Sequence, residues 1–167
     1  MSILERQDHT KSLVRGAIIA AIYAALTLAL APISYGAGQL RVAEALTVLP
    51  FVMPRSAVPG LFVGCLLANL FGGGGIWDIV FGSAATLLAA LLTARCRHRL
   101  LAPLPPVVLN AVVVGTVLYV LYYAGSGIPI WLIMAQVGAG QCLACYGLGL
   151  ALLRFVETRF PSWRERN

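Results

Sequence analysis

Almost all the arginines of this chain are gathered in three patches, with long apolar stretches between them that contain almost none. Only 11% of its 167 residues are charged, 60% are hydrophobic, and the mean hydropathy is +0.88. A chain of this composition has too few polar side chains to cover a water-soluble surface. The sequence therefore predicts an all-α integral membrane protein.

Four apolar stretches are long enough to cross a bilayer as helices, which takes about 20 residues. They cover residues 14–31, 79–94, 106–124 and 129–155. A fifth stretch, 42–71, is too long for one uninterrupted helix and contains three prolines near its middle. We interpret it as two short spans, 44–53 and 58–71. A pair of re-entrant half-helices would give the same sidedness.

Basic residues in short loops mark the cytoplasmic side of a membrane protein. With six crossings, four basic groups share the side of the N-terminus: Arg6, Lys11 and Arg15; Arg55; Arg95, Arg97 and Arg99; and Arg154, Arg159, Arg164 and Arg166. Only Arg41 is left outside. If 42–71 crossed the membrane only once, the arginines at 95–99 and the basic C-terminal tail could not both lie on the same side as the N-terminus. We therefore expect a six-helix bundle at 14–156, with cytoplasmic segments at 1–13 and 157–167.

The sequence lacks the residue patterns of common catalytic and metal sites. Cys142 and Cys145 form a CxxC, but His9 and His98 lie outside the apolar spans, so no zinc ligand set is complete. The glycines at 72–75 are not followed by the lysine of a phosphate-binding loop. We expect neither enzyme activity nor a metal, cofactor or nucleic-acid site, and we attribute the net charge of +6 to membrane topology.

Polar side chains inside a bilayer are costly unless they meet a partner, water or a ligand. Here they gather toward the outer side of the predicted bundle, with aromatic side chains that can stack on a planar ring. The candidate ligand-binding residues are Arg41, Glu44, Asn69, Asp78, Gln136 and Gln141, and the aromatic residues Tyr35 and Trp77. This arrangement predicts a pocket that opens to the outside.

Each of these residues also has a structural explanation. Asp78 can cap the N-terminus of its helix, and Glu44 can pair with Arg41 three residues earlier. Aromatic side chains at this level can form an interfacial belt. Asn110 lies about one turn from the cytoplasmic end of its span, where we expect a structural role or a partner contact. The sequence leaves these alternatives open.

The first span has small residues every four positions on two neighbouring stripes. One stripe contains Ala17, Ala21 and Ala25, and the next contains Gly16, Ala20 and Ala24. Small residues four apart let a second helix approach closely. Packing within the bundle and docking of a partner subunit both explain this pattern.

Several segments of the chain resemble the QueT family, the substrate-binding S-components of energy-coupling factor (ECF) transporters for queuosine precursors. The resemblance is carried by 30–36 (LAPISYG), 40–51 (LRVAEALTVLPF), 59–69 (PGLFVGCLLAN) and 78–83 (DIVFGS), and it extends over about residues 15–154. It implies a six-helix bundle in a prokaryotic cell membrane that captures its substrate outside. Such a bundle docks on a transmembrane coupling subunit driven by two cytoplasmic ATPases, so ATP is used by the partners alone.

The resemblance also implies roles for particular residues. The stripe of Ala17, Ala21 and Ala25 matches the surface by which S-components meet the coupling subunit. The implied substrate is a 7-deazaguanine, such as the cyano or aminomethyl precursor or queuine. A carboxylate at Glu44 or Asp78 can accept the two adjacent donors of its guanine-like edge.

One position departs from the family pattern, because Gln141 stands where a glutamate is usual. This loss of charge favours a neutral ligand such as the cyano form over the aminomethyl form. Three other functions stay open at this point. They are a solitary or proton-coupled small-molecule carrier that works without an ATPase, an S-component for a different vitamin, and a structural membrane protein.

Overall fold

The computed structural model describes residues 3–34, 40–73 and 75–165, and the regular structure in these ranges is entirely helical. The α-helices are α1 (Ile3–Ala29), α2 (Ala31–Ser34), α3 (Pro54–Phe71), α4 (Gly75–Trp77), α5 (Ser83–Arg95), α6 (Leu104–Leu118), α7 (Ile130–Cys142) and α8 (Leu150–Arg159). The 3₁₀-helices are η1 (Val42–Phe51), η3 (Arg99–Leu101) and η6 (Pro161–Trp163), and the π-helical stretches are η2 (Asp78–Gly82), η4 (Tyr119–Tyr123) and η5 (Leu143–Gly149).

Five continuous helices in the described part of the chain are long and apolar enough to cross a membrane. They are Arg6–Ala29, Pro54–Phe71, Gly75–Arg95, Arg99–Tyr123 and Ile130–Arg159. The last three each combine α-helix with a π-helical stretch. The predicted class, an all-α membrane protein, is confirmed by this architecture.

The second predicted span, 44–53, differs from the other five. It corresponds to η1, a helix of ten residues that covers about 20 Å at a 3₁₀ rise of about 2.0 Å per residue. This is shorter than the ~30 Å of a hydrocarbon core. Every residue from 43 to 50 is buried, so protein surrounds η1. Short irregular helices are tolerated at membrane depth where protein covers them.

The direction of η1 follows from the packing of its neighbours, α1 and α3. A Cβ added at Gly60 would lie 2.5 Å from the Gly16 carbonyl oxygen, and one added at Gly64 would lie 2.9 Å from the Ala20 carbonyl oxygen. The contact points therefore advance together along the two helices, which run parallel. The chain between them must return, and η1 makes this return through the centre of the bundle.

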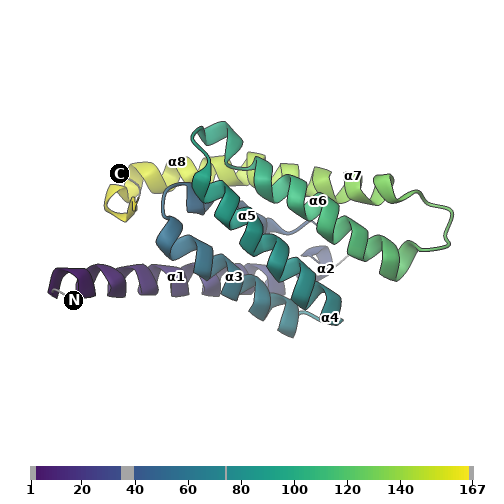
Figure 1. Cartoon of the computed structure of the whole chain (residues 1–167), viewed down its shortest axis with the longest axis horizontal. Helices are drawn as coiled ribbons and strands as arrows, with labels where there is room; N and C mark the ends of the chain where they lie inside the picture. Colours follow the sequence, from purple (N-terminus) through teal and green to yellow (C-terminus); the bar gives the residue numbers. More distant parts are fainter. Residues whose placement is uncertain (1–2, 35–39, 74, 166–167) are drawn as a thin grey trace.

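The two ends of the chain lie at the same end of the bundle. Figure 1 shows the N-terminal end of α1 and the C-terminal end of α8 together, with the turn between α6 and α7 at the far end. The starts of α3 and α6 lie toward the terminal end in the same view. We refer to this as the terminal end of the bundle below.

The structure separates the two small-residue stripes of α1. Gly16 and Ala20 are buried, and they pack against the backbone or side chains of α3. Ala17, Ala21 and Ala25 are exposed on the adjacent face. The stripe with Gly16 and Ala20 is thus explained by packing within the bundle, and the stripe of Ala17, Ala21 and Ala25 has no such explanation.

Replacing Gly60 with alanine is expected to lower stability, because the new methyl group would meet the Gly16 carbonyl oxygen at 2.5 Å. Overpacking of this kind costs about 1–3 kcal/mol. The measurement is the melting temperature of the purified protein in detergent.

Gly147→Ala is the matched control for this experiment. A Cβ at Gly147 would have no neighbour within 4 Å, and alanine favours a helix over glycine by about 0.5–1 kcal/mol. We expect an unchanged or higher melting temperature. Equal effects of the two substitutions would contradict the close packing of α1 on α3.

Candidate functional site

The carboxylate of Glu44 lies at the centre of the bundle. Glu44 is the third residue of η1, and only 1% of its surface is exposed. A buried carboxylate is strongly destabilised unless it is hydrogen-bonded or paired with a cation. Its surroundings are therefore the first place to look for a functional site.

The two oxygens of Glu44 accept hydrogen bonds from two different helices. The hydroxyl of Tyr23 in α1 donates to Oε1 at 2.5 Å, and Nδ2 of Asn110 in α6 donates to Oε2 at 3.2 Å. Tyr23 and Asn110 are themselves buried. Because a carboxylate offers about four acceptor positions, Glu44 keeps the capacity to accept further bonds.

Arg41 and Asp78 belong to the same electrostatic environment. The guanidinium of Arg41 attracts the carboxylates of both Glu44 and Asp78, and both Arg41 and Asp78 are buried. Asp78 is the fourth residue of the continuous helix Gly75–Arg95. It is therefore inside the first turn, and the alternative in which Asp78 caps the start of this helix does not fit its position.

Asn69 joins α3 to the helix that carries Asp78. Its Nδ2 donates to the backbone oxygen of Asp78 at 2.9 Å, and it also lies 3.5 Å from Cys65 Sγ. The Thr86 hydroxyl extends this contact, at 3.3 Å from Cys65 Sγ. Asn69 Oδ1 and Ser83 Oγ are buried polar atoms without a hydrogen-bond partner in the described part of the chain. They are available to a polar ligand.

Gln141 approaches the centre from α7. Cys145 Sγ lies 3.4 Å from the Glu44 backbone oxygen and 3.6 Å from Gln141 Oε1. The Thr47 hydroxyl donates to the same Glu44 oxygen at 2.6 Å. Gln141 is 4% exposed, so its amide is held within the core.

Five of the eight predicted ligand-binding residues are thus buried and connected around η1. We call them the central cluster, and they are Arg41, Glu44, Asn69, Asp78 and Gln141. Two further predicted residues, Trp77 and Gln136, lie outside the central cluster. Trp77 is 51% exposed and stacks on Phe81 with ring centroids 5.7 Å apart, and Gln136 is exposed on α7. Tyr35 lies outside the described residues.

Sequence reasoning missed two members of the site, Tyr23 and Asn110. Tyr23 is the only aromatic residue in the apolar stretch 14–31, and Asn110 is the only amide in 106–124. Polar side chains that stand alone in a membrane span usually mark a functional position. That signal was present in both cases. The depth estimated from the sequence separates Asn110 from Glu44 and therefore favours a structural role or a partner contact for Asn110.

The buried carboxylate and amide side chains of this site are groups that can exchange hydrogen bonds with a polar solute. Among the described residues, no group of three or more His, Cys, Asp or Glu is arranged to hold a metal ion. A multi-pass helical bundle with buried charged and amide side chains is typical of a membrane transport protein. The chain belongs to the QueT transporter family, because the model of that family matches residues 13–158.

The family match confirms the resemblance carried by the sequence motifs. It also confirms the expectation of a transporter, since this is not a family of enzymes. Comparison with curated proteins and with solved structures gives no match.

Tyr23→Phe is expected to destabilise the protein, since it removes the Tyr23 hydroxyl, which with Asn110 Nδ2 donates to the Glu44 carboxylate. A hydrogen bond to a charged group contributes about 1.5–3 kcal/mol. The measurement is unfolding of the purified protein in detergent. Tyr122→Phe is the control, because Tyr122 is 68% exposed and should tolerate the change. Equal stability of the two variants would show that Tyr23 does not support Glu44.

Proposed function

We propose that this chain is the substrate-capture subunit of an ECF-type importer for a queuosine precursor. It binds a 7-deazaguanine base from outside the cell and delivers it in complex with a transmembrane coupling subunit and two cytoplasmic ATPases. The observation that supports this most directly is Glu44, a buried carboxylate with unused acceptor capacity at the centre of a QueT-family bundle.

The chemistry of the central cluster suits a guanine-like edge. Such an edge presents two adjacent N–H donors, which one carboxylate can accept together. Glu44 and Asp78 are the two carboxylates near Arg41. The carbonyl of the base requires a donor, for which the amide of Gln141 is suited, and Asn69 Oδ1 remains an acceptor.

We further propose six membrane crossings with both ends of the chain in the cytoplasm. The parallel course of α1 and α3 supports η1 as the sixth crossing, because the chain must return between them. Arg15 and Arg55 lie near one another at the terminal end, where both contact the same segment of the tail. Basic residues at one end of a bundle mark its cytoplasmic side.

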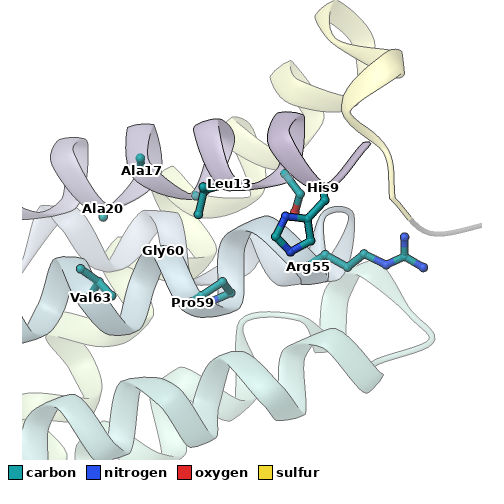
Figure 2. Close-up of a pocket in the computed structure, with 10 residues that line it drawn as sticks. His9, Leu13, Ala17, Ala20, Arg55, Pro59, Gly60 and Val63 are labelled. Atoms are coloured by element: carbon teal, nitrogen blue, oxygen red, sulfur yellow. The ribbon is translucent and has the colours of Figure 1, made fainter. Parts of the chain in front are cut away.

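The exposed face of α1 supports the proposed coupling subunit as the partner. Ala17, Ala21 and Ala25 form a smooth surface on which another helix can pack closely. A groove of about 340 Å³ runs beside Ala17 between α1 and α3, and Figure 2 shows its lining residues. The coupling subunit would thus meet α1 directly next to the α1–α3 contact.

The first test is direct calorimetric binding to the purified protein in detergent. Cyano-deazaguanine, aminomethyl-deazaguanine, queuine and guanine are compared, and the cyano form is expected to bind tightest because Gln141 supplies no charge for an ammonium group. Glu44→Gln should weaken binding at least about tenfold, since each buried hydrogen bond to a charged group contributes about 1.5–3 kcal/mol.

Gln136→Ala is the matched control for binding, because Gln136 is exposed on α7 and outside the central cluster. Its affinity should equal that of the unmodified protein. Tightest binding of the aminomethyl form would overturn the role given to Gln141. No binding of any deazaguanine would move the proposal to a different vitamin.

The double substitution Ala21→Leu with Ala25→Leu is expected to abolish uptake while leaving substrate binding intact. Two bulky side chains would separate the partner helix from α1, whereas the central cluster would be unaffected. The measurements are uptake in cells that contain the ATPases and binding to the purified variant.

A matched control places the same change at exposed alanines elsewhere, Ala84→Leu with Ala151→Leu. Uptake should then be normal. If the Ala21 and Ala25 substitutions reduced binding and uptake equally, this face would belong to the bundle itself. Uptake that persisted without ATPases and collapsed with an uncoupler would instead support a proton-coupled carrier.

A further inference from the structure

The segment after α8 folds back onto the first turn of α3. Glu165 Oε2 accepts hydrogen bonds from the backbone N–H groups of Arg55 at 2.7 Å and Ser56 at 3.1 Å. The Ser56 hydroxyl donates to Glu165 Oε1, and the Glu165 backbone N–H donates to the Val52 oxygen at 3.0 Å. One residue of the tail thus binds the start of α3 through both its side chain and its backbone.

These contacts satisfy groups that α3 cannot satisfy by itself. The first N–H groups of a helix have no intrahelical partner, and a carboxylate placed there is favourable. The residue at the N-cap of α3 is Met53, whose side chain forms no cap hydrogen bond. Glu165 therefore serves as the cap of a helix that begins more than one hundred residues earlier.

The same tail also holds α1. Arg15 Nη1 lies 3.9 Å from Glu165 Oε1, and Nη2 donates to the Ser162 oxygen at 3.2 Å. The guanidinium lies over the Trp163 ring at 5.5 Å from its centroid. Because the Arg15 and Glu165 side chains are only 17% and 8% exposed, this ion pair is less screened by solvent than a surface pair.

The contacts of Glu165 define a clasp that joins α1, α3 and the tail. A direct hydrogen bond between the Ser12 and Ser56 hydroxyls, 3.1 Å apart, closes it on the α1 side. The clasp lies at the mouth of the α1–α3 groove, because Ser12 and Arg55 also line that groove. Figure 2 shows His9 and Arg55 near each other at this mouth, with Leu13, Ala17 and Val63 further along.

We infer that Glu165 is a positioning residue for partner docking. By fixing α1 against the first turn of α3, it sets the spacing of the two helices along the groove and keeps the face of Ala17, Ala21 and Ala25 ready for the coupling subunit. This inference rests on the proposed function for its link to uptake. The clasp itself rests on the contacts of Glu165 alone.

The test uses Glu165→Gln, which removes the charge and keeps the size of the side chain. Substrate binding to the purified protein should be unchanged, because the central cluster is not touched. Association with the coupling subunit and ATPases, and uptake by the assembled transporter, should fall about tenfold, in line with the loss of charge-assisted hydrogen bonds. Glu165→Asp should restore part of the uptake.

Glu157→Gln is the matched control. Glu157 is the other acidic residue that follows Asp78, and it pairs with Arg99 at 2.6 Å between α8 and η3. This variant removes the same charge away from the groove, and its uptake should be normal. A fall in uptake equal to that of Glu165→Gln would overturn the specific role of Glu165.

Spin labels at Leu13→Cys and Val63→Cys measure the spacing directly, since both side chains are exposed on the two helices. The exposed Cys142 and the half-buried Cys96 are replaced by alanine beforehand. We expect a narrow distance distribution in the parent protein and a broad one with Glu165→Gln. Unchanged distributions would overturn the clasp, even if the parent protein bound no deazaguanine. Unchanged association and uptake would overturn its link to docking.

Discussion

The burial of Glu44 is the constraint on which the rest of this structure depends. A carboxylate in the interior of a membrane protein is tolerated only with hydrogen bonds and a compensating charge. Tyr23 and Asn110 supply the hydrogen bonds, and Arg41 supplies the charge. The first two come from α1 and α6, so the carboxylate is satisfied only when both helices place these side chains beside it. The requirement of one side chain thus fixes the relative positions of three elements.

The form of η1 follows from the same requirement. A 3₁₀-helix has poorer hydrogen-bond geometry than an α-helix, and a run of ten residues is unusual. Side chains supplement its backbone, since the Thr47 hydroxyl donates to the Glu44 oxygen and Cys145 Sγ lies 3.4 Å from it. Complete burial makes these contacts necessary, because no water reaches the backbone there. Such a helix is stable only inside a bundle that provides its partners.

The sequence predicted the long spans well because hydropathy belongs to continuous segments. The prediction at 129–155 corresponds to Ile130–Arg159, and 58–71 falls within Pro54–Phe71. The depth of single side chains in the membrane was predicted poorly. The estimate assumed a uniform helical rise, which separated Glu44 from Asn110, although their side chains meet at 3.2 Å. The sequence also did not predict that the Trp77 side chain points away from the central cluster, toward the surface. Trp77 directly precedes the π-helical η2, and such a stretch breaks the 3.6-residue period on which facing estimates rely.

The three faces of α1 connect the central cluster to the outside of the bundle. Tyr23 holds Glu44, Gly16 and Ala20 pack on α3, and Ala21 is exposed. At Gly16, Gly60 and Gly64 the two helices meet backbone to backbone, and close-packed contacts transmit strain instead of absorbing it. A displacement of Glu44 that moves Tyr23 must therefore move α1 and α3 together. In the proposed importer, the exposed alanine face of α1 would shift together with α3, and the coupling subunit on that face would respond to a solute in the central cluster without touching it.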